Sequence, residues 1–127
     1  MAGTKLDGAG AEKMKTIEEA LTALQTINGM VERMAIEIKR QRSVGIIPQQ
    51  IKRNAAIIQG QLKGRFELIA DQFTAMVLVV GRGGGDAARL RALREYVAQI
   101  RTSLELAEKR VKEEHSVPID MPADEEA

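Results

Sequence analysis

The residues that come closest to a known chemical motif form a glycine-rich stretch in the second half of the sequence. The apolar run Met76–Val80 is followed by four glycines within Gly81–Gly85, an order typical of nucleotide-binding folds, in which a strand leads through a glycine turn into a helix. The third glycine position of that motif holds Asp86 here, and its carboxylate would repel a pyrophosphate. No Lys-Ser or Lys-Thr pair follows the glycines. We therefore interpret Gly81–Gly85 as a loop between two helices.

Metal binding and acid–base catalysis have little basis in the sequence. His115 is the only histidine, and the adjacent Glu113 and Glu114 lack the three- or four-residue spacing at which helical ligands converge on a metal. The sequence has no cysteine, and the pattern places no histidine or lysine to activate a serine or threonine. We expect neither an enzyme nor a protein that holds a cofactor.

A long interval without acidic residues is the most distinctive charge feature. No Asp or Glu occurs between Glu37 and Glu67, whereas the interval contains Lys39, Arg40, Arg42, Lys52, Arg53, Lys63 and Arg65. Such a patch can hold the phosphates of RNA or DNA, although no aromatic side chains are interleaved to stack bases. In a bundle of three helices, the acidic end of the last helix would return to the same pole. We interpret the pole as solvated and self-neutralised; nucleic acid or an acidic protein is the alternative partner.

Two sets of residues are candidates for contact with a protein partner. Ala56, Gly60 and Gly64 stand four residues apart, and two glycines inside a helix cost about 1 kcal/mol each relative to alanine. A neighbouring helix of the chain is the preferred explanation, and a second copy is the alternative. Leu78 and Val79 belong to a run of four apolar residues that one helix face cannot bury. They indicate either a self-association surface or an apolar cap at the end of the bundle.

Long helices must position these residues. From Pro48 to Val80 the apolar residues recur in steps of three and four, which predicts one helix of about nine turns. A first helix is predicted to begin with a capping box at Thr16–Glu19 and to end before Ser43. A third is predicted from Asp86 to about residue 114. In both helices apolar residues form a seam that repeats every seven residues and is expected to be buried: Ile17, Leu24, Val31 and Ile38 in the first, and Leu90, Leu93, Val97, Ile100, Leu104, Ala107 and Val111 in the third. The sequence therefore predicts an all-α fold of three long antiparallel helices, an up-down-up bundle with coiled-coil-like packing.

The chain divides into three predicted parts. Residues 1–13 are glycine-rich and unpatterned and are expected to be a disordered arm, and residues 14–115 are expected to form the bundle. Residues 116–127 contain two prolines, four acids and no base, which predicts a flexible acidic tail. Val117, Ile119 and Met121 alternate ahead of its last acids, a pattern that suits a segment docked in a groove.

The composition sets the remaining limits. A chain of 127 residues with 44% apolar and 29% charged residues is long enough for one domain with a substantial core. Its net charge of +1 provides no global attraction to nucleic acid or to a membrane. No apolar run approaches the roughly 20 residues that span a bilayer, and no apolar signal core is found near residue 1. We expect a soluble, cytoplasmic protein without membrane contact.

These observations favour a non-enzymatic protein–protein interaction module. Such an adaptor, scaffold or assembly subunit would act through its helix faces and associate with itself as a homo-oligomer or with another protein. The alternative hypothesis is a nucleic-acid-associated helical bundle that uses the basic pole of residues 39–65, with the acidic tail as a modulator.

Overall fold

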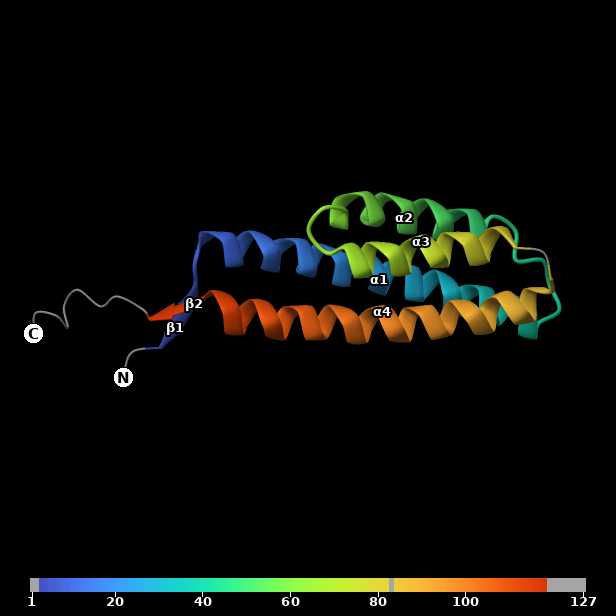
Figure 1. The fold of residues 1–127 in the computed structure, drawn as a ribbon. Coiled ribbons are helices and arrows are strands. Elements are labelled where there is room, and N and C mark those ends of the chain that lie inside the picture. The colour runs from blue at the N-terminus through green and yellow to red at the C-terminus, as the bar shows by residue number, and fades with distance from the viewer. Residues whose placement is uncertain (1–2, 83, 119–127) are drawn as a thin grey trace, which may run out of the picture.

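The computed structural model describes residues 3–82 and 84–118. Its helices are α1 (Gly8–Lys39), α2 (Ile47–Leu62), α3 (Glu67–Gly81) and α4 (Asp86–His115), and two short strands, β1 (Thr4–Leu6) and β2 (Ser116–Pro118), flank them. Each helix runs antiparallel to the next (Figure 1). The predicted helical bundle is confirmed, but the predicted number of helices is wrong, because four are found among the described residues.

The predicted helix from Pro48 to Val80 is broken in its middle. After α2 ends, Lys63 has extended backbone and Gly64 has a φ of +90°, a left-handed conformation that favours glycine. The Gly64 N–H donates a hydrogen bond to the Glu67 carboxylate at the start of α3. The chain thus reverses within a few residues, and one long helix becomes a hairpin of two shorter ones.

Because α2 and α3 are short, they cover only part of the length of α1 and α4 (Figure 1). Around the hairpin, α1 packs on α2, α2 on α3, α3 on α4, and α4 on α1. Beyond the α2–α3 turn, the first part of α1 and the last part of α4 continue as a pair without the hairpin (Figure 1). The structure is therefore a four-helix bundle at one end and a two-helix pair at the other.

The core is almost entirely aliphatic, with the Phe73 ring as its one fully buried aromatic side chain among the described residues. The apolar seams predicted for the first and last helices are buried except for Ile38, Leu90 and Ala107, which are partly buried. Each fully buried Leu, Ile or Val contributes roughly 1.5–3 kcal/mol. Their central members are Ile17, Leu24, Val31, Leu93, Val97, Ile100 and Leu104. The seven-residue spacing in the sequence therefore identified the buried faces of both long helices.

The two ends of the described chain meet beyond the last turn of α4. The strand β1 pairs antiparallel with β2, with Lys5 opposite Val117. The prediction of a disordered arm over residues 1–13 is wrong for its described part from Thr4 onward, because that segment forms β1 and the first turns of α1. Of the predicted tail, residues 116–118 form β2, and residues 119–127 lie outside the described residues.

The first helix also begins earlier than predicted. Asp7 is its N-cap, and the Asp7 Oδ1 accepts a hydrogen bond from the Gly10 N–H at 2.7 Å. Thr16 lies inside the helix, where its hydroxyl donates to the Glu12 carbonyl at 3.2 Å instead of capping Glu19. A capping box matched in the sequence was therefore not a helix start.

Candidate functional site

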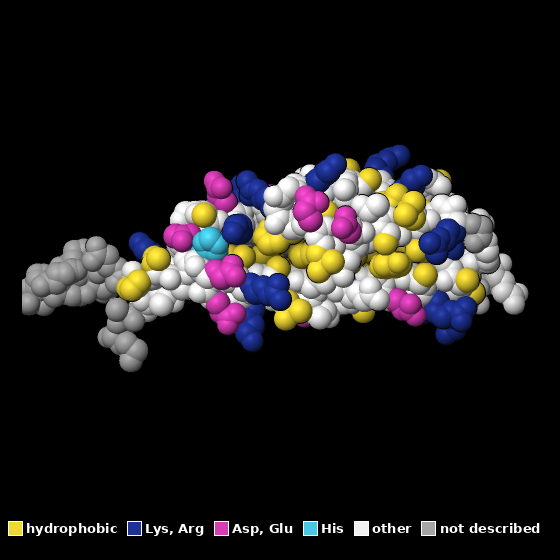
Figure 2. All heavy atoms as spheres, viewed as in Figure 1, with side chains coloured by type: hydrophobic (Ala, Val, Ile, Leu, Met, Phe, Trp, Pro, Cys, Tyr) yellow, Lys and Arg dark blue, Asp and Glu magenta, His cyan; other side chains and the backbone are white. Residues whose placement is uncertain are grey.

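Exposed apolar side chains gather along α3 and its border with α4. Leu68 and Leu78 on α3 are 71% and 59% exposed, and Leu106 on α4 is 51% exposed. Leu68, Ala75 and Leu78 are separated by seven and three residues, so they share one outward face of α3. Figure 2 shows hydrophobic side chains in a band over this side of the molecule. We call this surface, with the groove described next, the α3–α4 face.

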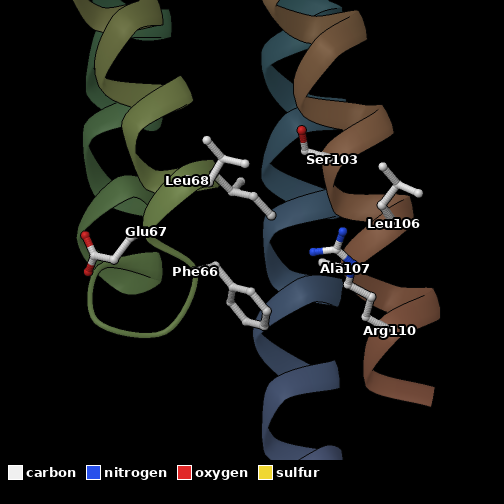
Figure 3. Close-up of a pocket in the computed structure, with 8 residues that line it drawn as sticks. Phe66, Glu67, Leu68, Ser103, Leu106, Ala107 and Arg110 are labelled. Atoms are coloured by element: carbon white, nitrogen blue, oxygen red, sulfur yellow. The ribbon is translucent and has the colours of Figure 1, made fainter. Parts of the chain in front are cut away.

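A groove of about 290 Å³ opens between the beginning of α3 and the second half of α4 (Figure 3). The Phe66 ring lies in the gap between the two helices, whereas the Glu67 carboxylate points away from it. The remaining lining residues are Leu68, Ile69, Ser103, Leu106, Ala107 and Arg110. The groove lies where the α2–α3 turn leaves α4 with α1 alone as its helical neighbour, so it is a direct result of the short hairpin.

The predicted self-association residues fall in different environments. Leu78 is part of the α3–α4 face, but Val79 is only 5% exposed, so the prediction of Val79 as a surface residue is wrong. Ala56 and Gly60 lie exposed on the outer side of α2, and Gly64 lies in the α2–α3 turn. A Cβ added at Gly60 or Gly64 would have no described atom of the rest of the chain within 4 Å. The preferred explanation, a close helix–helix contact within the chain, therefore does not apply to the described structure.

The seven basic residues of the predicted polyanion patch divide into two groups. Lys63 and Arg65 lie at the α2–α3 turn, about 24 Å along α2 from its start, and the Arg65 Nη1 donates to the Thr16 hydroxyl at 3.3 Å. The other five lie where α1 leads into α2: Lys39, Arg40, Arg42, Lys52 and Arg53. They therefore form one cluster of five rather than one of seven.

The four-helix topology removes the neutralisation that three helices predicted. The helix α4 begins beside the α1–α2 loop and ends at the opposite end of the molecule (Figure 1). Glu113 and Glu114, in its last turn, therefore lie far from the basic residues around that loop. Residues 32–53 and 82–95, which we call the basic end, contain ten Lys and Arg against four Asp and Glu. The rest of the described residues contain nine against ten, and four further acids belong to residues 119–127. The net charge of +1 thus conceals a concentration of positive charge at one end of the described structure.

A polar cluster that the sequence analysis missed joins the two ends of the chain. The His115 Nδ1 lies 3.1 Å from the Asp7 Oδ1, and the Lys13 Nζ lies 3.1 Å from the His115 Nε2. Because an ammonium group only donates, this geometry is compatible with the His115 Nε2 accepting from Lys13 and the Nδ1 donating to Asp7. The hydrogen bond from the Gly10 N–H, with a further contribution from His115, lowers the pKa of Asp7. We call Asp7, Lys13 and His115 the terminal clasp.

No local spacing in the sequence could reveal the terminal clasp, since 108 residues separate Asp7 from His115. Its three side chains form hydrogen bonds with one another. The Asp7 N–H also donates to the His115 carbonyl at 2.9 Å. The clasp therefore holds the first turn of α1 against the last turn of α4.

Comparisons with protein-family models, with curated proteins and with solved structures found no match. Among residues 3–82 and 84–118, no group of three or more His, Cys, Asp or Glu is placed to hold a metal ion. No helix in the same residues has the length and apolar character needed to cross a membrane.

Proposed function

We propose that this protein is a non-enzymatic protein–protein interaction module, an adaptor, scaffold or assembly subunit, that binds its partner through the α3–α4 face. The supporting observation is the exposure of Leu68, Leu78 and Leu106 on two neighbouring helices beside an apolar groove. Single exposed leucines are common on monomeric proteins, whereas an apolar band beside a groove is typical of interaction sites.

The energetics indicate the role that these leucines would have in a complex. Each of the three exposes more than half of its surface, so completing its burial would contribute roughly 1–2 kcal/mol. A specific interface buries about 800 Å² on each partner and must offset the entropy lost on association. The leucines and the Phe66 groove would therefore form the centre of an interface, and the polar residues around them its rim.

The shape of the α3–α4 face suits an amphipathic helix, whose apolar side chains can enter the groove while its backbone lies along α3. In our proposal the partner is a second copy of the chain in the cytoplasm. A two-fold pair would set the same face of each copy against the other. The exposed Ala56 and Gly60 on α2 belong to another side of the molecule and are not needed for this contact.

The proposal is tested by measuring mass in solution by light scattering over a range of concentrations in 0.5 M salt, at which ion pairs between copies are screened. We expect a dimer that Leu68→Glu or Leu78→Glu converts to a monomer, because the new carboxylate would be buried in the interface. Ile57→Glu is the matched control, because Ile57 is 58% exposed on α2, away from the α3–α4 face. Circular dichroism verifies that each variant is folded. A wild-type protein that remains monomeric at every concentration contradicts self-association, and a dimer that survives both leucine changes contradicts this face.

A further inference from the structure

The basic end carries more positive charge than its own acids compensate. Three of its four acids already form ion pairs with arginines of the same end: Glu37 with Arg42 at 2.8 Å, Glu32 with Arg94 at 3.0 Å, and Asp86 with Arg89. Within the described residues, the exposed Lys39, Arg40, Lys52 and Arg53 take part in no ion pair. Uncompensated like charges on two adjoining helices repel one another, so an anionic partner is favoured at this end.

The basic end also carries an apolar groove. It is about 420 Å³ in volume and lies between the last turns of α1 and the α1–α2 loop. Ile36 and Ile46 line it and are 47% and 68% exposed, and its lining also includes Val44, Ile47, Ser43 and the charged Arg33 and Glu37. A groove that combines exposed isoleucines with surrounding cations suits a segment that is both apolar and acidic.

The chain itself contains such a segment in residues 119–127. Ile119 and Met121 supply apolar side chains, and four acids accompany them without a single base: Asp120, Asp124, Glu125 and Glu126. The chemistry of this segment is therefore complementary, in both charge and apolar character, to that of the basic end.

The segment cannot reach this groove and the unpaired cations in its own molecule. It follows Pro118, which lies beyond the last turn of α4, whereas the groove and the cations lie where α1 leads into α2, beside the start of α4. The helix α4 has 30 residues and is therefore about 45 Å long. Nine residues in a fully extended chain span at most about 32 Å. Contact between the two is therefore restricted to different copies.

We propose that residues 119–127 of one copy bind the basic end of a second copy, with Ile119 and Met121 in the Ile36–Ile46 groove and the acids against the unpaired cations. This head-to-tail contact is separate from the α3–α4 face. The donor and the acceptor lie at opposite ends of one molecule, so the contact is heterologous and continues into chains or closes into rings.

The observations favour this acidic segment over nucleic acid as the occupant. Nucleic acid would engage the cations but would gain little from exposed isoleucines, and the basic end contains no aromatic residue, since Tyr96 directly follows it. Single-stranded nucleic acid is usually held by stacking on aromatic side chains.

Two complementary variants of the full chain test the proposal. The first lacks residues 119–127 and retains the basic end; the second carries Arg40→Glu and Arg53→Glu and retains the acidic segment. We expect the average mass of the wild-type protein in solution to increase with concentration in 20 mM salt. Each variant alone should lose the head-to-tail contact. Their mixture should form a one-to-one complex. In 0.5 M salt the screening length falls from about 20 Å to about 4 Å, and binding should weaken about tenfold or more.

A matched control separates this contact from general charge effects. Lys63→Glu with Arg65→Glu changes the net charge equally, but both residues lie at the α2–α3 turn, so head-to-tail binding should persist. Leu68→Glu should also leave it intact, which distinguishes a failure here from a failure of the α3–α4 proposal. In case a charge-reversed variant does not fold, a fluorescent peptide of residues 116–127 is titrated onto the truncated chain, with a peptide of reversed sequence as control.

The proposal is overturned if the mixture of complementary variants forms no complex in 20 mM salt, or if the Lys63 and Arg65 changes abolish binding to the same extent as the Arg40 and Arg53 changes. It is also overturned if the labelled peptide and its reversed form bind equally. If the wild-type protein makes no head-to-tail contact and instead binds a DNA oligonucleotide, more tightly after removal of residues 119–127, then the basic end is a nucleic-acid site.

Discussion

Replacing Gly10 with alanine tests whether the two ends of the chain meet as described. A Cβ at this position would lie 2.4 Å from the His115 Cβ and 3.0 Å from its Cγ. Contacts below about 3.4 Å between such atoms are strained, so α1 and α4 would have to separate by roughly 1 Å, or the terminal clasp would have to open.

The expected change in stability follows from two opposing effects. Overpacking of this kind costs about 1–3 kcal/mol, while alanine in a helix gains up to about 1 kcal/mol over glycine, and less in the first turn. We therefore expect Gly10→Ala to lower the free energy of unfolding by about 1–2 kcal/mol. For a chain of this length, that corresponds to a decrease in Tm of about 4–8 °C.

Gly29→Ala in the same helix is the matched control. A Cβ at Gly29 would have nothing within 4 Å, so this change should raise the free energy of unfolding by about 0.5–1 kcal/mol. Thermal and urea unfolding followed by circular dichroism measure both variants. If Gly10→Ala proves as stabilising as Gly29→Ala, then α1 does not approach α4 at His115, and the described junction is wrong.

Two further predictions concern the α2–α3 turn and the terminal clasp. Gly64→Ala should destabilise the protein by about 1 kcal/mol or more because alanine is strained at a φ of +90°, whereas Gly60→Ala inside α2 should stabilise it in urea unfolding; stabilisation by both would indicate an unbroken helix. The lowered pKa of Asp7 means that its charge stabilises the folded state above the unfolded pKa of about 3.9, and that this contribution is lost as pH falls through the folded pKa. Wild-type protein should therefore exceed Asp7→Asn in stability at pH 6 and approach it by about pH 2; a difference that does not change with pH would contradict this.

The hairpin was missed because it leaves the apolar period undisturbed. Leu62 ends the buried stripe of α2, and Ile69 begins that of α3. The step of seven positions from Leu62 to Ile69 equals about two turns of a helix. A stripe interrupted by such a turn looks continuous in the sequence. Gly64 was the local sign of a break, but its spacing from Gly60 suggested a small-residue surface instead.

The wrong number of helices also caused the wrong prediction that the acidic end of the last helix neutralises the basic residues. The basic residues were visible in the sequence, but their compensation depends on which end of the bundle receives the acidic end of the chain. An odd number of helices places Glu113 and Glu114 beside the α1–α2 loop, and an even number places them opposite it. By contrast, burial of the seams containing Leu24 and Ile100 depended only on local periodicity, and the structure confirmed it.

The pairing of β1 with β2 makes the most distant segments of the described chain into neighbours. During folding, the α2–α3 hairpin needs only a short loop to close, whereas contact between the two strands encloses more than 100 residues and costs more chain entropy. We expect the hairpin and its neighbouring turns to assemble first, and α1 and α4 to join progressively toward β1 and β2. The last contacts to form would also be the first to open in the native state, so backbone amides near the chain ends should exchange with solvent well before those beside Phe73.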